Sequence, residues 1–190
     1  MNEAVDWQIG EQIVIASTDF DMNHAETFYI QSIDRTNIDN PVITLDSPLK
    51  FDHFAKTENY GGVDIDMRAE VGLLTRNVVF RGDPETSSAN MYGAIIFMHS
   101  QGDDSIIGKL SYIELRDVGQ AFKVGRYPIH FHMVGNIMQS YAIGNSIHDS
   151  NNRAITIHGV HYLTVKENVA YNIKGHSVFI EDSIESRNFI

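Results

Sequence analysis

The segment NSIHDSNNRAITIH at residues 145–158 is followed by a second segment of the same pattern, NVAYNIKGHSVFIE at residues 168–181. The two segments repeat with a period of about 23 residues. The alignment matches Asn145 with Asn168, Asp149 with Asn172, and the pair Ile155 and Ile157 with Val178 and Ile180. A short alternating strand that recurs at this distance, after an asparagine-rich corner, is typical of the stacked coils of a parallel β-helix.

The same strand can be traced backwards from this repeat with looser spacing. Related segments are PIHFH at residues 128–132 and AIIFMH at residues 94–99. Four coils are therefore predicted, and a stacked core needs a minimum of about three. We predict an all-β chain in which residues 59–190 form the coils of a parallel β-helix.

The composition agrees with this fold class and excludes several others. Ile and Val together supply 37 residues against 18 for Leu plus Ala, which favours strands over helical bundles. The formal net charge of −11 argues against nucleic acid as a partner. Because there is no cysteine, neither a disulfide framework nor a thiolate metal site is expected. No segment is apolar over the roughly 20 residues that a membrane span needs, and MNEAVDWQIG does not resemble an export signal.

Residues 1–58 are predicted to form a separate β-rich domain. Short strands are expected at Glu11–Ala16, Phe28–Ile33 and Pro41–Leu45, with Asp/Asn-rich turns between them. From Val63 to Val71 apolar and charged side chains alternate without a break, and we expect the apolar face to meet a core. Asp19, Asp21 and Asn23 have the first spacings of a calcium loop, but no Glu stands at its last position, so an Asx turn is the alternative.

Strand parity predicts which side chains of the coils face outward. If Ile129, Phe131 and their counterparts point into the core, His99, His132, His158 and Glu181 share one exposed column, with neighbours about 4.8 Å apart. His130 would lie beside this column, and Arg126 and Arg153 just upstream of it. Asp117, Asp149 and Asn172 would form a second column at a corner.

Three interpretations of the exposed column remain open at this point. A flat β face of His, Arg, Asp and Asn suits a polysaccharide, where histidine can move protons and Glu181, Asp182 or Asp149 can supply the carboxylates of glycoside cleavage. Three imidazoles and a carboxylate are also suitable donors for a divalent cation, zinc or calcium, with His99, His132, His158 and Glu181 as the ligand set. The column could equally be a ladder of polar side chains with no ligand.

Several long motifs resemble one known family. WQIGEQIVIASTDFDMN at residues 7–23 is similar to the closing part of a G8 domain. VDIDMRAEVGLLTRN at residues 63–77, GRYPIHFHM at 125–133, SIHD at 146–149, TIHG at 156–159 and GHSVFIED at 175–182 are similar to the adjoining β-helix. The family comprises the cell-surface hyaluronidase, the cell migration-inducing hyaluronan-binding protein and fibrocystin-like proteins.

The resemblance implies a right-handed parallel β-helix of PbH1-type repeats, cut short at residue 190, preceded by a partial G8 domain over residues 1–58. It implies an extracellular or cell-surface protein, whose membrane anchor, if it has one, lies outside this chain. The implied activity is binding and hydrolysis of hyaluronan or a similar polysaccharide, and the alternative is a non-catalytic fibrocystin-like adhesion module. On this basis the predicted catalytic residues are His130, His132, His158, Glu181 and Asp149, and the predicted substrate-binding residues are Arg126, Arg153, Asn152 and His176.

The negative charge of the chain opposes binding of hyaluronan, which is itself a polyanion. We therefore expect either a local gathering of Lys123, Arg126, Arg153 and Lys166, or a bridging cation.

Overall fold

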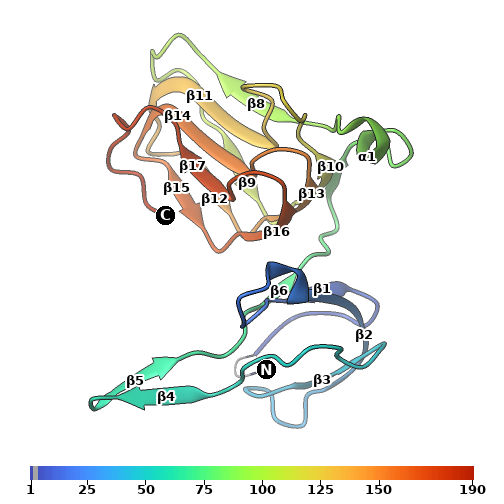
Figure 1. Cartoon of the computed structure of the whole chain (residues 1–190). Helices are drawn as coiled ribbons and strands as arrows, with labels where there is room; N and C mark the ends of the chain where they lie inside the picture. The colour runs from blue at the N-terminus through green and yellow to red at the C-terminus, as the bar shows by residue number, and fades with distance from the viewer. Residues whose placement is uncertain (2–3) are drawn as a thin grey trace. The chain divides into compact units, whose positions relative to one another are not determined.

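The computed structural model describes residue 1 and residues 4–190, and these residues form an all-β chain with parallel sheets. The chain divides into two units, Met1–Thr75 and Arg76–Ile190 (Figure 1). The boundary predicted at residue 58 was therefore too early. The physical reason is a strand pairing that is distant in sequence, because β6 (Val71–Leu73) pairs with β1 (Gln12–Ile15) and so belongs to the first unit.

The first unit is built on a four-stranded antiparallel sheet with the order β3-β2-β1-β6. Its core contains Ile13, Phe28 and Ile30. The remaining elements are β2 (Glu26–Asp34), β3 (Val42–Leu45), the 3₁₀ turn η1 (Met22–His24), and a separate hairpin of β4 (Thr57–Tyr60) and β5 (Val63–Asp66).

The prediction that the apolar face of residues 63–71 meets a core was wrong for its first half. Val63 is 63% exposed and Ile65 is 45% exposed. Their strand, β5, pairs with β4 in a two-stranded hairpin, and no other strand of the described residues joins it. Alternation of apolar and charged side chains shows that the two faces of a strand differ. It does not show whether another part of the protein covers the apolar face.

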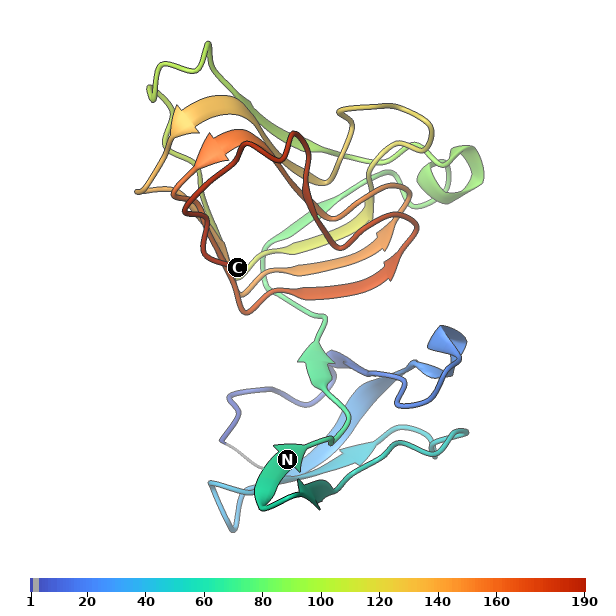
Figure 2. The ribbon, with the colours of Figure 1, turned by 60° about the vertical axis from the view of Figure 1, so that its left-hand side comes forward.

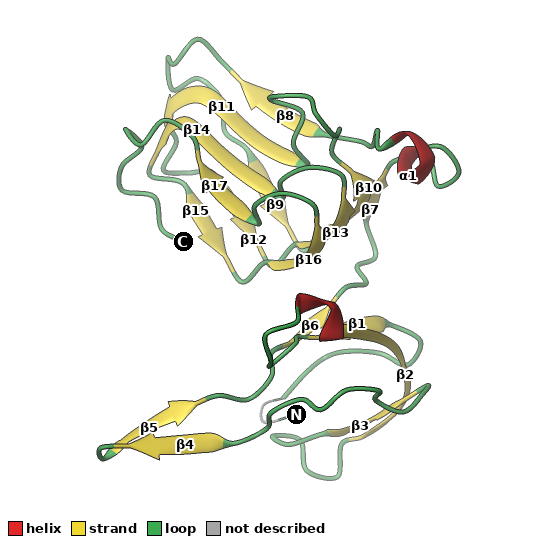
Figure 3. Cartoon of the chain, viewed as in Figure 1, coloured by secondary structure: helices red, strands yellow, loops and turns green. Residues whose placement is uncertain are grey.

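The second unit consists of three parallel sheets. Each of the first three turns of the chain contributes one strand to each sheet, and the fourth turn contributes β16 and β17 to the first two. Figure 2 shows the turns stacked on one another, and Figure 3 shows that the unit is almost entirely strands and loops. The first sheet contains β7 (Val79–Arg81), β10 (Glu114–Val118), β13 (Ser146–Ser150) and β16 (Val169–Ile173). The second contains β8 (Ile96–His99), β11 (Ile129–Asn136), β14 (Ile155–His161) and β17 (Val178–Ile180). The third contains β9 (Lys109–Ser111), β12 (Tyr141–Ile143) and β15 (Thr164–Lys166).

This arrangement agrees with the four predicted coils of a β-helix. A single helical turn, α1 (Ser87–Asn90), lies in the segment between β7 and β8. Among the described residues, no helix has the length and apolar character that a bilayer crossing demands. The right-handed sense and the PbH1 type of the repeats stay predictions.

The coils are held together by inward-pointing apolar side chains and by a buried asparagine ladder. Ile129, Phe131, Ile155 and Ile157 are at most 1% exposed and belong to one core cluster. The predicted alignment of Asn145 with Asn168 is confirmed, since Asn145 Nδ2 donates to Asn168 Oδ1 at 2.9 Å. Such a ladder satisfies buried backbone groups at the corner where the sheets cannot.

The corners themselves require an unusual backbone conformation. Asp117, Asp149 and Asn172 are the second-to-last residues of β10, β13 and β16, and all three have a positive φ, between 50° and 53°. Asp and Asn adopt this left-handed region more readily than most residues with a side chain. The second polar column expected from the sequence is therefore the corner that turns the chain from the first sheet toward the second.

Candidate functional site

Two adjacent files of side chains lie on the outer face of the β8–β11–β14–β17 sheet. The histidine file contains His99, His132 and His158, which are paired in register, and is continued by Glu181, whose N–H donates to Ile157 O at 3.0 Å. The aromatic file contains Phe97, His130, Thr156 and Phe179, also paired in register. The vertical column deduced from strand parity is thus present.

The sequence suggested a flat, open face, but the structure shows a face that is partly covered. His130 is 1% exposed and Thr156 is fully buried, while His132 and His158 are half-buried. The segment between β10 and β11 covers this part of the face, since the Tyr127 ring lies 4.8 Å from the His130 ring and Gly125 O contacts His130 Nδ1 at 2.9 Å. Burial is caused by this long connection, whose path strand parity cannot predict.

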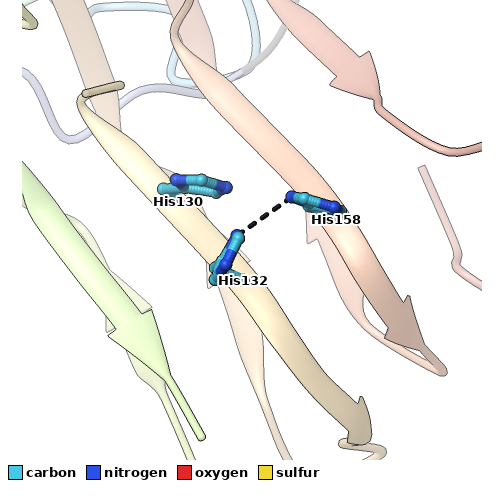
Figure 4. Close-up of side chains that lie close together, drawn as sticks. All are labelled: His130, His132 and His158. Carbon is cyan, nitrogen blue, oxygen red and sulfur yellow. Dashed lines mark hydrogen bonds between the residues drawn. The ribbon is translucent and has the colours of Figure 1, made fainter. Parts of the chain in front are cut away.

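Three imidazoles converge at the centre of the face. Figure 4 shows His130 and His132 on β11 turned toward His158 on β14. The Nδ1 atoms of His132 and His158 are 2.9 Å apart, and one potential ligand atom from each of the three rings lies within 4.8 Å of the others. His99 is not in this group, although its ring centroid is 5.0 Å from that of His132.

The surroundings keep His130 uncharged at neutral pH. Burial lowers the pKa of His130 to about 4, and the positive charges of neighbouring rings and of Arg153 act in the same direction. Its Nδ1–H donates to Gly125 O, so its Nε2 carries the lone pair. Burial and the neighbouring His158 also lower the pKa of His132. The surroundings thus disfavour the charged forms of His130 and His132.

Two carboxylates adjoin the cluster from the turn after β17. Asp182 Oδ2 lies 2.9 Å from His158 Nε2, and Glu181 Oε2 lies 3.7 Å from His158 Nδ1. The carboxylate of Asp182 favours a proton on Nε2, and the lone pair of a neutral His158 ring is then on Nδ1, which faces His132 and Glu181. An imidazole oriented by a carboxylate is the arrangement used both for proton transfer and for metal binding.

Arg153 lies beside these carboxylates between two aromatic rings. Its guanidinium carbon is 3.6 Å from the centroid of Phe179 and 4.6 Å from that of Tyr127. Its Nη1 is 3.4 Å from Glu181 Oε2, and Tyr127 Oη donates to Glu181 Oε1 at 3.4 Å. Cation–π contacts on both faces hold the guanidinium plane in one orientation.

The other predicted substrate-binding residues have different surroundings. His176 is exposed, and its ring centroid is 5.0 Å from that of Phe179. Arg126 is exposed on the covering segment. Asn152 has a structural role, because its Nδ2 donates to Gln120 O at 2.8 Å and to Lys123 O at 3.2 Å, which fastens that segment. Its amide donors are thus committed, contrary to the role expected for it.

Asp149, predicted as a catalytic carboxylate, belongs to a second cluster at the corner. Its Oδ2 is 2.8 Å from His148 Nδ1, and its Oδ1 accepts from Asn172 Nδ2 at 2.6 Å. Glu114 Oε1 is 3.4 Å from His148 Nε2. Burial lowers the pKa of His148, but the two carboxylates outweigh it and raise that pKa to about 9. Asp149 thus neutralises the buried imidazolium of His148 and belongs to this corner cluster. The carboxylates next to His158 are those of Glu181 and Asp182.

Sequence reasoning missed the aromatic partners of Arg153. Strand parity puts Phe179 at an outward position of its coil, next to Glu181, and an aromatic ring at such a position is a signal that could have been used. Tyr127 stands in an irregular segment, so its position could not be deduced from parity.

A sequence model of the CEMIP beta-helix family matches residues 91–190. The chain belongs to the CEMIP beta-helix family. The match covers all four strands of the outer face described above, together with the covering segment and both carboxylates.

Relatives extend the similarity over the rest of the chain. Fibrocystin-L of Mus musculus is 36% identical over 225 aligned residues, which cover 100% of this chain and 5% of that protein. Cell surface hyaluronidase CEMIP2 of Homo sapiens is 35% identical, covering 99% of this chain and 14% of that protein. A G8 domain-containing protein of Dictyostelium discoideum is 33% identical, covering 100% and 12%. This CEMIP beta-helix chain therefore corresponds to a small part of each of these proteins.

Proposed function

We propose that this chain is part of an extracellular or cell-surface protein that binds hyaluronan or a similar polysaccharide and hydrolyses its glycosidic bonds. The name of the human relative, cell surface hyaluronidase CEMIP2, supports the location, the substrate and the reaction. The fibrocystin-L relative is the reason for keeping a non-catalytic alternative. We also propose that the first unit, Met1–Thr75, contains the closing part of a G8 domain, which the similarity to a G8 domain-containing protein over the whole chain supports.

The observation that carries the proposal is the position of Arg153 between Tyr127 and Phe179, next to Glu181 and the histidine cluster. The half-buried ring of Phe179 can stack on the apolar face of a sugar ring, whereas Tyr127 is buried and supports Arg153 from below the surface. A guanidinium with five N–H donors recognises a uronic acid carboxylate. Half-buried His158 and Glu181 lie within reach of a sugar held there. Binding groups and proton-transfer groups are thus combined on one face.

The positions of the residues on this face suggest a role for each in glycoside hydrolysis. His158, oriented by Asp182, is the proton-handling residue, and Glu181 is the carboxylate that stabilises positive charge at the anomeric carbon. In the overall reaction one water molecule is consumed, its hydroxyl ends on the anomeric carbon, and a proton ends on the leaving oxygen. Arg153, Arg126 and His176 would hold the polymer.

A size-exclusion assay of high-molecular-weight hyaluronan tests the proposal. We expect the chain to shorten the polymer, and we expect His158→Gln and Glu181→Gln to abolish shortening while keeping the fold. His161→Gln is the matched control, because His161 is also on β14 but its Nδ1 contacts Ser186 outside the cluster. Shortening that survives both site substitutions would overturn the assignment of the site.

The second candidate function is a non-catalytic adhesion or glycan-binding module. It predicts retention of the chain by immobilised hyaluronan with no change in polymer length. Arg153→Gln would weaken this retention, whereas His158→Gln would leave it unchanged. The length of the polymer after incubation therefore separates the two functions.

A further inference from the structure

We propose that His130, His132 and His158 bind a divalent zinc-class ion, with Glu181 as the neighbouring carboxylate, since its Oε2 is outside the group of three but only 3.7 Å from His158 Nδ1. One ligand atom from each imidazole lies within 4.8 Å of the others, and no other group of His, Asp and Glu side chains in residue 1 and residues 4–190 meets this criterion. The ion would lie on the outer face of the sheet, under the edge of the segment between β10 and β11.

A buried lone pair without a partner is the first observation that points to a ligand here. His130 is 99% buried, and its Nε2 lone pair has no hydrogen-bond partner within the described part of the chain. The buried Glu181 Oε2 also makes no hydrogen bond, and Arg153 Nη1 is its ion-pair partner at 3.4 Å. An unsatisfied buried acceptor is destabilising, so the lone pair of His130 needs an explanation. A cation that accepts this lone pair supplies one.

The hydrogen bonds on the far sides of the rings are the second observation. Metal-binding histidines almost always donate their other N–H to a carboxylate or a backbone carbonyl. His158 Nε2 contacts Asp182 Oδ2 at 2.9 Å, and His130 Nδ1 donates to Gly125 O at 2.9 Å. In both rings the nitrogen left over carries a lone pair that points into the cluster. Two of the three ligands are thus already in the required tautomer.

The contact between His132 and His158 fits the same arrangement. Their Nδ1 atoms are 2.9 Å apart, and His158 Nδ1 is 3.7 Å from Glu181 Oε2. Tetrahedral ligands at zinc bond lengths of 2.0–2.1 Å are separated by roughly 3.3 Å, which lies between these two distances. Binding of the ion requires that the His132 proton resides on Nε2, so that both Nδ1 lone pairs face the metal.

The donor set selects the class of ion. Three imidazole nitrogens and one carboxylate oxygen suit zinc, whereas calcium requires six to eight oxygen ligands. Of the two cations considered from the sequence, the geometry therefore favours zinc. The geometry also puts His130 in the place that the sequence analysis gave to His99 as a ligand. The Nδ1–H of His99 donates to His132 O at 3.1 Å, and the ring of His99 is outside the group of three.

An ion at this site would change the charge of the candidate glycan site. Glu181 and Asp182 place negative charge beside Arg153, where a polyanionic sugar chain has to bind. A divalent cation offsets both carboxylates and can polarise an oxygen of the substrate or a bound water. With His158 engaged as a ligand, a water bound to the ion would take over the proton transfer that His158 performs in the ion-free site. This role of the ion rests on the proposed glycan function, but binding of the ion itself does not.

Metal titration of the whole 190-residue chain, stripped with a chelator, tests the proposal. We expect isothermal titration with Zn²⁺ to show one ion per chain, and Co²⁺ to give the visible absorption of a tetrahedral site. His158→Gln and Glu181→Gln should lower the affinity about 10- to 100-fold or more, as loss of a ligand or its support does elsewhere. His161→Gln is the control and should bind as the unchanged chain does. Zn²⁺ should raise the unfolding midpoint of the unchanged chain and of the control, but not that of His158→Gln.

The outcomes separate this proposal from the proposed function. Absence of stoichiometric binding, or equal affinity of the unchanged chain and a folded His158→Gln chain, would overturn the metal site. If the chelated chain still binds hyaluronan and takes up no ion, the metal site fails and the glycan function stands. If the chain binds the ion but neither binds nor shortens hyaluronan, the glycan function fails and the metal site stands.

Discussion

His132 and His158 are 26 residues apart in the sequence, yet their Nδ1 atoms are 2.9 Å apart on adjacent strands. Parallel pairing of β11 with β14 fixes this contact, because His132 is directly opposite His158 in the register. Two imidazole nitrogens at this distance share one proton or one cation. The repeat of the coils thus brings two imidazoles that are distant in the sequence close enough to interact.

Arg153 is expected to decide the affinity for a polyanionic glycan. Arg153→Gln removes the charge and should weaken binding of hyaluronan at least 10-fold, with a smaller salt dependence. Arg153→Lys keeps the charge but not the planar stacking on Tyr127 and Phe179, and should restore only part of the affinity. Binding to immobilised hyaluronan over a salt series measures both effects. Arg187→Gln is the control, since Arg187 stacks on Tyr162, outside the two files; equal losses in Arg153→Gln and Arg187→Gln would contradict the assignment.

His148 is expected to make the stability of the chain fall at alkaline pH. Its pKa is raised from 6.5 to about 9 in the folded state, so the folded chain binds more protons than the unfolded chain between these values. The stabilisation is complete below pH 6.5 and is lost as the pH rises through 9, and it amounts to about 3 kcal/mol at most. Urea unfolding at pH 6, 7.5 and 9.5 measures this loss. The decrease in the free energy of unfolding between pH 6 and pH 9.5 should disappear in His148→Gln. A decrease that remains in this variant would show that another group causes it.

Asn145 is expected to contribute strongly to stability although it is polar. It is fully buried, its Nδ2 donates to Leu110 O and Asn168 Oδ1, and its Oδ1 accepts from Ile113 N. Asn145→Ala leaves several of these buried groups unpaired and should cost about 2–4 kcal/mol. Chemical denaturation measures the change. Asn136→Ala is the control, because Asn136 is exposed and should cost less than about 1 kcal/mol; similar losses would show that the ladder is not what stabilises the corner.

Phe131 is expected to hold two coils together through packing alone. It is 1% exposed in the core cluster, so Phe131→Ala should destabilise the second unit by about 3–5 kcal/mol. The partner substitution Phe97→Ala removes an aromatic ring that is 45% exposed and should cost much less. Thermal unfolding followed by near-ultraviolet circular dichroism compares the two. A greater loss for Phe97→Ala would mean that parity assigns the inward and outward faces wrongly.

The sequence was sufficient for the coils and for the order of residues in the histidine file. Both follow from period and parity, as the pairings of His99, His132 and His158 show. It was insufficient wherever a result depended on irregular segments or on side-chain torsions. The path of residues 119–128 decides that His130 is buried, and ring orientation decides that His130 rather than His99 joins the cluster. The pairing of β6 with β1, which moves the unit boundary to residue 75, depends on a contact between distant segments.

The left-handed residues near the ends of β10, β13 and β16 are followed by connections of different length, while the strands stay in register. Residues 119–128 form a long connection over the outer face, whereas residues 151–154 and 174–177 lead directly into the next strand. The length of this one connection therefore controls the access of solvent to the imidazoles, with no change in the stacked strands. Replacing residues 119–128 with the short turn of a neighbouring coil would expose His130.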